Sequence, residues 1–277
     1  MSSTNATASA ISAVFNDSHA AGRMAFMPFV TAGDPDLTTT IDVIDRLAGE
    51  GVDLIEIGVP YSDPIADGPV IQASYTRALE AGFKLSQFFE AFENADRSQW
   101  PPLVAMVSYS IVFRYGVENF LDKAAASGFA GLIVPDLPGD EADQLANTIR
   151  ARGLDLVELL SPLTPAERVP RILANGSGFV YCIAVAGTTG ERDQLPPALA
   201  NQLAELRQAT DLPLAVGFGV SRPEHIAALR GKADGAIVGS AIVRKFEKIT
   251  ESREKTLNEI SDFARQMVKA CRSTEHR

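Results

Sequence analysis

Short apolar runs alternate with amphipathic stretches along nearly the whole chain. The runs are continuous and rich in Val, Ile, Leu and Phe, which is typical of parallel strands buried on both faces. The expected strands are Ala25–Thr31, Leu54–Gly58, Leu103–Val107, Gly131–Val134, Leu156–Leu160, Phe179–Ala184, Leu214–Gly217 and Gly235–Val238. Between them apolar residues recur at helical spacing. The expected helices are Leu37–Glu50, Leu85–Ala95, Val117–Ser127, Glu141–Arg152, Ala166–Asn175, Leu199–Thr210, Pro223–Arg230 and Ser252–Cys271.

Three further helices are expected outside this alternation. Ala10–His19 precedes the first strand, Pro69–Ala81 follows the second and Ala241–Glu247 follows the eighth. Strand–helix units without a linker-like break, in a chain of 277 residues, predict a single α/β domain folded as a (β/α)₈ TIM barrel. Residues 11–277 would form that domain and residues 1–10 a flexible tail. The alternative, an open doubly wound sheet, rarely needs so many evenly spaced units.

Charge and composition narrow the possible partners and location. A net charge of −10 argues against nucleic acid or an anionic membrane surface as a partner. Two cysteines, Cys182 and Cys271, without a CxxC motif fit a reduced cytosolic protein. No apolar run approaches the roughly 20 residues of a membrane span. The segment Met1–Ala10 lacks the basic and hydrophobic regions of a signal peptide, so we expect a cytoplasmic protein.

The second expected strand carries the most distinctive chemistry. Glu56 lies inside its apolar run, and a buried carboxylate is costly unless it has a chemical task. The loop that follows adds two more carboxylates, Asp63 and Asp67. In a TIM barrel the loops after the strands form the active site. The pattern therefore indicates general acid–base chemistry at the end of this strand.

Glycine-rich loops follow the sixth, seventh and eighth strands. They read Ala186-Gly187-Thr188-Thr189-Gly190-Glu191, Phe218-Gly219-Val220-Ser221 and Gly239-Ser240-Ala241. Phosphate commonly binds at such loops in barrels, held by backbone N–H groups at the start of a helix. Each glycine alone could equally serve a tight turn. Three such loops at one end of a barrel favour a phosphate site.

Other chemistries find less support. His19 and His276 lie near the termini, and His225 lies in a helical pattern away from the strand ends, so we expect surface or packing roles for all three. No lysine falls within an expected strand, which disfavours a Schiff base. Tyr181 lies in the sixth strand, where it is either a core aromatic residue or part of the site mouth.

A metal site is the remaining alternative. Asp63 and Asp67 could bind Mg²⁺ together with a substrate phosphate. They could equally be a turn residue before Pro64 and a helix cap near Pro69. Since no further ligands cluster nearby, no metal is expected.

Several segments together resemble the α-subunit family of tryptophan synthase. They are Pro28–Pro35, Glu56–Gln72, Gly187–Gly190, Gly217–Ser221 and Gly239–Val243, in the family's order across nearly the full chain. The resemblance implies a retro-aldol cleavage of indole-3-glycerol phosphate to indole and glyceraldehyde 3-phosphate. It also implies a lyase that needs no cofactor of its own.

The resemblance assigns roles to residues of the site. Glu56 matches the acid–base residue that protonates the indole ring at C3 and takes the hydroxyl proton of the side chain. Asp67 matches the carboxylate that stabilises charge at the indole nitrogen, and Tyr181 matches a tyrosine lining the site. Thr189 matches a lid threonine that bonds the aspartate. The remaining matches are the phosphate cradle and the aromatic residues around the indole: Gly190, Gly219, Gly239 and Ser240, and Phe29 and Phe218.

A partner is implied in the same way. Pro60 and Asp63 match positions at the interface with a pyridoxal-phosphate-dependent β subunit, in an α₂β₂ complex that uses the indole for tryptophan synthesis. Three residues depart from the usual pattern: Ser110 replaces a common asparagine, Ala184 a serine and Thr188 the valine of the lid.

Three alternative functions would fit the same barrel. They are a free-standing indole-3-glycerol-phosphate lyase, a catalytically inactive activator of a β subunit, and a phosphosugar isomerase. Retention of Glu56, Asp67 and Thr189 together argues against the inactive activator. The lack of a site histidine or lysine disfavours the isomerase.

Overall fold

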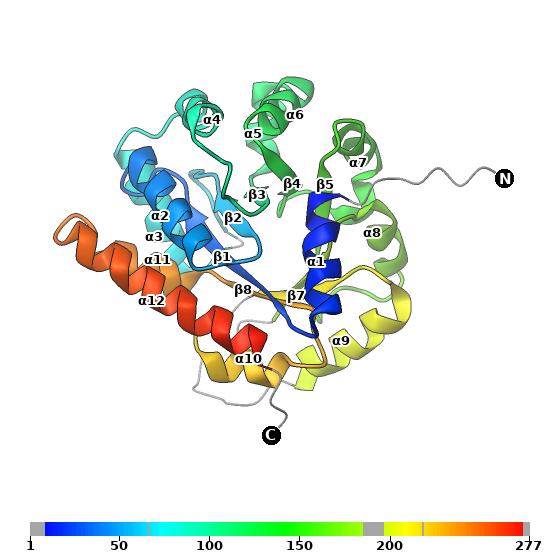
Figure 1. Ribbon diagram of the computed structural model, residues 1–277. Coiled ribbons are helices and arrows are strands. Elements are labelled where there is room, and N and C mark those ends of the chain that lie inside the picture. The colour runs from blue at the N-terminus through cyan, green and yellow to red at the C-terminus, as the bar shows by residue number, and fades with distance from the viewer. Residues whose placement is uncertain (1–8, 66, 185–196, 218, 274–277) are drawn as a thin grey trace.

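The described residues form a closed barrel of parallel strands. The computed structural model describes residues 9–65, 67–184, 197–217 and 219–273. Eight strands pair in sequence order around the barrel, with the helices outside (Figure 1). The strands are β1 (Ala25–Thr31), β2 (Ile55–Gly58), β3 (Leu103–Met106), β4 (Phe129–Ile133), β5 (Asp155–Leu160), β6 (Val180–Ile183), β7 (Leu214–Gly217) and β8 (Gly235–Val238). The TIM barrel is confirmed and the open sheet is wrong.

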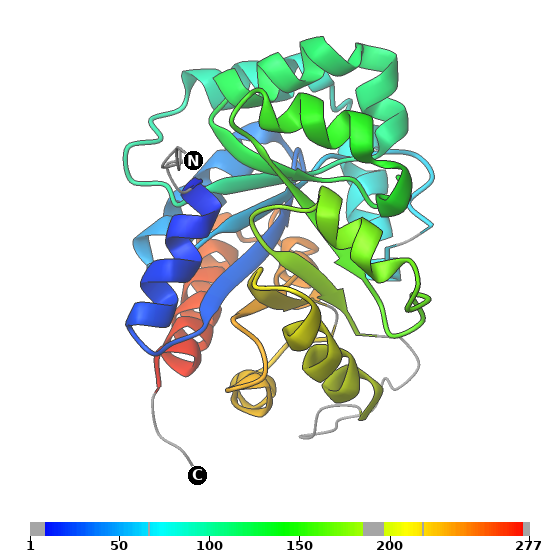
Figure 2. The ribbon, with the colours of Figure 1, turned by 90° about the vertical axis from the view of Figure 1, so that its right-hand side faces the viewer.

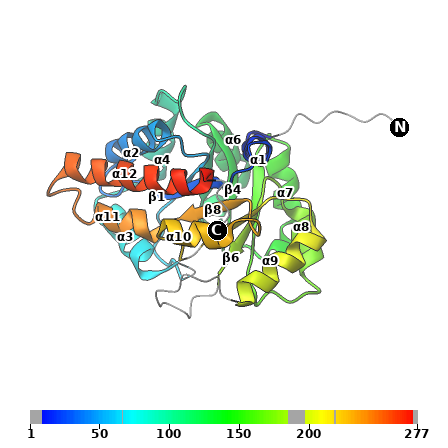
Figure 3. The same ribbon diagram turned by 60° about the horizontal axis from the view of Figure 1, so that its bottom comes forward.

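The helices alternate with these strands. They are α1 (Ala10–Ala20), α2 (Leu37–Gly49), α3 (Pro69–Glu80), α4 (Leu85–Asn94), α5 (Tyr109–Tyr115), α6 (Val117–Ala126), α7 (Asp143–Arg150), α8 (Val169–Asn175), α9 (Pro197–Ala209), α10 (Pro223–Leu229), α11 (Ser240–Phe246) and α12 (Arg253–Arg272), with a 3₁₀ turn η1 (Gly139–Glu141). The three expected extra helices are present as α1, α3 and α11. Figures 1 and 3 show α12 alongside α2, which it contacts. No helix in the described part of the chain is long and apolar enough to cross a membrane.

The first helix closes one end of the barrel. Ser9 caps α1 by accepting a hydrogen bond from the Ser12 N–H (3.1 Å), and its hydroxyl donates to the Asp155 carboxylate at the start of β5 (2.5 Å). Ile11 and Phe15 are buried in the cluster that fills the barrel interior. Figure 2 shows α1 in blue beside the start of β1. This end holds the strand starts, so the site lies at the opposite end.

Several local features differ from the sequence-based expectation, among them one helix and the start of one strand. The short helix α5 was not expected, because seven residues are too few to show a helical period; Ser108 caps it. Strand β4 begins at Phe129 and not at Gly131. Its pairing with β3 shifts register between Leu103 and Val104, and such an irregularity has no signal in the hydrophobic pattern.

Candidate active site

Glu56 is the second of the four residues of β2, with its side chain in the barrel interior. It pairs in register with Phe29 of β1 and Val104 of β3, which are both buried. Its Oε1 atom has no hydrogen-bond partner among the described residues. Burial, and to a lesser extent the charge of Asp67, raise the pKa of Glu56 to about 8. The carboxyl group is therefore mostly protonated at neutral pH and can act as an acid.

Asp67 lies on the loop that leads from β2 to α3. The Asp67 N–H donates to the Pro64 carbonyl (3.0 Å), and the Gln72 side-chain amide donates to the carbonyls of Pro64 (3.1 Å) and Asp67 (2.8 Å). Burial raises the pKa of Asp67 to about 6, and a hydrogen bond from the Tyr61 hydroxyl opposes this rise. Two carboxyl groups with pKa values pushed apart, one protonated and one ionised near neutrality, are typical of acid–base sites.

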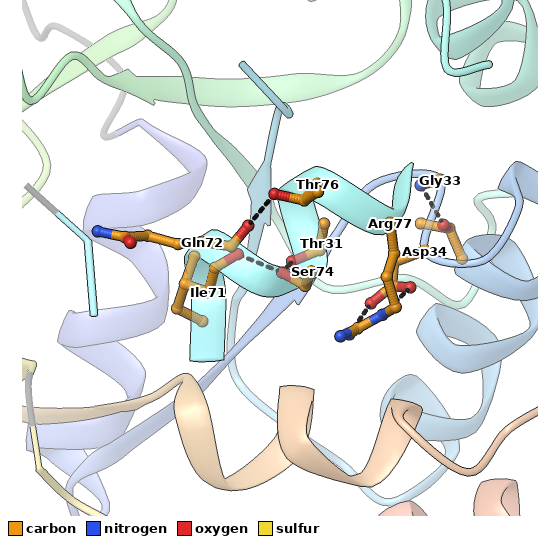
Figure 4. A network of polar contacts seen from close by, with 9 residues as sticks. Thr31, Gly33, Asp34, Ile71, Gln72, Ser74, Thr76 and Arg77 are labelled. Atoms are coloured by element: carbon orange, nitrogen blue, oxygen red, sulfur yellow. Dashed lines mark hydrogen bonds and ion pairs between the residues drawn. The ribbon is translucent and has the colours of Figure 1, made fainter. Parts of the chain in front are cut away.

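Helix α3, which follows this loop, is hydrogen-bonded to β1 and to the loop after β1 (Figure 4). Arg77 donates two hydrogen bonds to the Asp34 carboxylate, from Nε (3.0 Å) and Nη2 (2.6 Å). One turn earlier, the Ser74 and Thr31 hydroxyls lie 2.7 Å apart. Helix α3 begins directly after the acidic loop. It is therefore tied to the end of β1 and to the loop that follows β1.

Aromatic rings surround the two carboxyl groups. Phe29 of β1 belongs to the interior cluster, and Tyr181 of β6 packs against it. A Cβ atom on Gly217 would collide with the Tyr181 ring, and one on Gly58 would collide with Phe29 and come within 2.7 Å of the Tyr75 hydroxyl. Glycine on these strands thus makes room for rings at the barrel mouth. Tyr75 is fully buried, and its hydroxyl has no partner among the described residues.

The loops after β7 and β8 lie at the same end of the barrel. Gly219 has a φ of 88°, a conformation that favours glycine, and the space around its α-carbon is open. Gly239 precedes α11, and its carbonyl accepts the N–H groups of Ile242 and Val243, so α11 starts at Ser240. This arrangement suits the expected phosphate cradle.

His225 corrects one expectation. It lies in the first turn of α10, but its ring turns back to the end of β7. Its Nδ1 atom is 3.1 Å from the Gly219 carbonyl oxygen and 3.2 Å from the Ser221 nitrogen, and its Nε2 is 3.3 Å from Arg222 Nη2.

Several expected site residues lie outside the described residues: Thr188, Thr189, Gly190 and Phe218. Of the two expected interface residues, Asp63 is exposed whereas Pro60 is buried. Tyr61 and Tyr75, next to Asp67, were not singled out from the sequence. Tyr61 lies on the same loop as Asp67, and Tyr75 lies on the helix that follows this loop. This closeness in sequence to the two acids could have pointed to both tyrosines.

A metal site was the alternative reading of Asp63 and Asp67. In the described part of the chain, no three His, Cys, Asp or Glu side chains are grouped to hold an ion.

Ser110 hydrogen-bonds to Ser108 (2.7 Å), whose hydroxyl donates to Asp136 after β4 (2.7 Å). Ser108 and the Tyr109 N–H thus tie the start of α5 to the loop after β4, and Ser110 supports Ser108.

Comparison with known proteins agrees with this architecture. Residues 15–272 match the family described as "Tryptophan synthase alpha chain". A protein of that name from Rhodopirellula baltica is 45% identical over 89% of this chain and 90% of its own length, and one from Gloeobacter violaceus is 43% identical over 94% of each. A crystal structure of tryptophan synthase from M. tuberculosis superposes with a TM-score of 0.85 at 32% identity, covering 96% of this chain and 100% of that chain. The chain belongs to the tryptophan synthase alpha chain family.

Proposed function

We propose that this chain is a lyase that cleaves indole-3-glycerol phosphate to indole and glyceraldehyde 3-phosphate. The observation that carries the proposal is the buried carboxyl group of Glu56, with a pKa of about 8, beside Asp67, with a pKa of about 6. A retro-aldol cleavage without lysine or metal needs an electron sink within the substrate. Protonation of an indole ring at C3 provides one.

The two carboxyl groups have different roles: Glu56 makes both proton transfers, and Asp67 stabilises charge. Glu56 gives its proton to C3 of the ring, while ionised Asp67 stabilises the positive charge that develops at the ring nitrogen. Glu56, now a carboxylate, takes the proton of the hydroxyl next to the ring. The carbon–carbon bond breaks, its electron pair passes into the ring, and an aldehyde and indole are formed. Glu56 ends in its starting protonation state, so the cycle is balanced.

The remaining residues bind the substrate. Phe29 and Tyr181 from the barrel interior, with Phe218, would pack against the indole ring. The backbone N–H groups of Gly219, Gly239 and Ser240, with Gly190, would hold the phosphate. Thr189 would bond Asp67 when the loop after β6 closes over the substrate and excludes water.

A β subunit is the proposed partner, in an α₂β₂ complex in which the β subunit carries pyridoxal phosphate. Indole is small and apolar, so a direct transfer to a consuming enzyme prevents its loss. Ile65, Phe113 and Leu163 are exposed by 85%, 67% and 78% and lie after β2, β3 and β5, at the end of the barrel that holds the site. Large exposed apolar side chains on one face favour a protein interface there, next to Asp63.

The decisive experiment compares Glu56→Gln with Glu80→Gln, an exposed glutamate of α3. Glu56→Gln should lower the rate of indole formation by at least about 10²–10⁴-fold, because both proton transfers are lost. Glu80→Gln should leave it unchanged. Indole formation near the unmodified rate in Glu56→Gln would disprove the assignment. Lack of activity in the unmodified chain, with and without a β subunit, would favour the inactive activator.

A further inference from the structure

Glu158 is a second buried carboxyl group, and the proposed reaction does not use it. It lies on β5 between Val157 and Leu159, which belong to the barrel interior, so its own side chain faces outward, toward η1 and α8. Only 6% of the residue is exposed. Its outward neighbours on the strand, Leu156 and Leu160, are apolar and pack in the outer core. A carboxyl group at this place is not required by the fold.

The surrounding residues leave Glu158 without a donor. Its Oε1 atom has no hydrogen-bond partner among the described residues. The nearby arginines are engaged by other carboxylates: Arg168 donates from Nε to Asp140 (2.9 Å) and again from Nη2, and Arg171 lies 3.5 Å from Asp143. The chain thus offers cations close by and pairs them elsewhere.

The Asn175 side-chain amide is engaged as well, by the Gly139 carbonyl and Asp143 (2.7 Å each). Burial, aided by the charge of Asp140, raises the pKa of Glu158 to about 7. Buried carboxylates are normally hydrogen-bonded or paired, so a carboxyl group without a donor among the described residues is suited to accept one from a bound ligand.

A cavity of about 280 Å³ opens beside this carboxyl group. Its walls come from the loop after β4, the loop after β5 and the start of α8; they include the apolar side chains of Leu137 and Ile172 and the hydroxyls of Ser161 and Thr164. Glycine keeps space around the acid: a Cβ atom on Gly139 would collide with Glu158 Oε2. The cavity is lined by Arg168 as well, but that guanidinium is paired with Asp140 and not with Glu158.

We propose that this cavity binds a small organic cation, an ammonium or amidinium group on a short apolar body. The cationic group donates hydrogen bonds to Glu158, and the apolar body packs against Leu137 and Ile172. The volume fits a small molecule at the lower end of ligand-site sizes. Strand β5 separates this site from Glu56, so it is distinct from the proposed active site.

The test uses n-butylammonium as the probe and n-butanol, which has nearly the same shape and no charge, as the matched control. The full chain is titrated at millimolar concentrations while the methyl resonances of Leu137 and Ile172 are followed by NMR. We expect saturable shifts with n-butylammonium and much weaker ones with butanol. Glu158→Gln should weaken n-butylammonium binding by about tenfold or more. Glu167→Gln, an exposed glutamate just before α8, should leave it unchanged.

A pH series provides an independent measurement on the unmodified chain. Binding should weaken between about pH 8 and pH 6 as Glu158 takes up a proton. The other facing groups do not titrate there, because hydrogen bonds hold the pKa values of Asp140 and Asp143 below their usual range and arginine stays charged. Absence of saturable shifts, equal binding of butanol, or unchanged binding in Glu158→Gln would overturn the proposal.

Discussion

Arg77 of α3 and Asp34 after β1 form a two-point ion pair in which the carboxylate is almost wholly buried and the guanidinium is not. Asp34 is 1% exposed, whereas the Arg77 side chain is 34% exposed. The pair holds the helix that begins directly after Asp67. Its two partners are not equivalent, because losing the cation leaves a buried charge and losing the acid leaves a cation that water can reach.

Arg77→Met should therefore destabilise the protein more than Asp34→Asn. We expect a loss of about 2–4 kcal/mol in the free energy of unfolding for Arg77→Met and about 1 kcal/mol for Asp34→Asn. Urea denaturation measures both. Arg265→Met, which removes a pair at a mostly exposed side chain, serves as control and should cost under about 1 kcal/mol. Equal losses for the two partners would contradict this account of the pair.

The cleavage rate should have a bell-shaped pH dependence. The reaction needs Asp67 ionised and Glu56 protonated, so kcat/KM should fall below about pH 6 and above about pH 8. Because the two carboxyl groups interact, these are apparent pKa values of the pair. Tyr61→Phe removes the hydrogen bond that lowers the Asp67 pKa. The acid limb should then move to higher pH while the alkaline limb stays. An unchanged acid limb in Tyr61→Phe would show that Tyr61 does not act on Asp67.

Glu158 should reduce stability at neutral and alkaline pH. Because its pKa is about 7 in the folded chain against a model value of 4.5, the folded state binds more protons than the unfolded state between these values. Stability contributed by this group therefore falls as pH rises through that window. Glu158→Gln should raise the free energy of unfolding by about 1–2 kcal/mol at pH 8 and leave it nearly unchanged at pH 4. Lower stability of the variant at pH 8 would mean that a donor already pairs with Glu158.

His225 should position the turn after β7 that offers Gly219 to the phosphate. Its Nδ1 faces both a carbonyl and an amide of that turn. His225→Leu should raise KM about tenfold with kcat nearly unchanged, because a lost hydrogen bond to a binding loop weakens ground-state and transition-state binding alike. His225→Gln, which keeps a donor and an acceptor, should bind glycerol 3-phosphate nearly as the unmodified chain does, measured by calorimetry. His19→Gln on α1 is the control. A fall in kcat at constant KM would refute this role.

Periodicity predicted the barrel because its strands are buried on both faces and its helices on one. For β1, β7 and β8 even the bounds agree with the structure. The burial of Glu56 was predicted in the same way, from a carboxylate inside an apolar run. The strand bounds and the burial of Glu56 both depend on adjacent residues, so they can be predicted from the sequence alone.

Relations between distant segments were not predictable. The return of His225 to Gly219 depends on how α10 leaves β7, and the ion pair of Arg77 with Asp34 joins residues 43 positions apart. Glu158 lies inside the apolar run Leu156–Leu160, so its burial could have been inferred as it was for Glu56, but its lack of a donor depends on the pairing of Arg168 elsewhere. Hydrophobic patterns carry no information on such pairings.

Phe113 should be central to binding the proposed β subunit. It is an exposed aromatic residue on α5, its ring 6.2 Å from that of Tyr109, at the same end of the barrel as the site. Truncation of a buried interface aromatic commonly costs about 2 kcal/mol or more, so Phe113→Ser should weaken the complex roughly thirtyfold or more. Indole formation by the isolated chain should not change, since Phe113 is an exposed residue of α5 with no role in the proposed reaction. Leu79→Ser, on α3, is the matched control.

We also expect coupling between the proposed active site and the proposed interface with the β subunit. If the partner favours the closed site by about 1–3 kcal/mol, the usual size of such couplings, glycerol 3-phosphate must tighten the association by the same factor. Calorimetric titration of the β subunit, with and without glycerol 3-phosphate, measures both effects. In Phe113→Ser the affinity should fall while the tightening factor stays, because the contact and the closure are separate contributions. Full affinity in Phe113→Ser, or an association indifferent to the phosphate ligand, would place the partner elsewhere and favour a free-standing lyase.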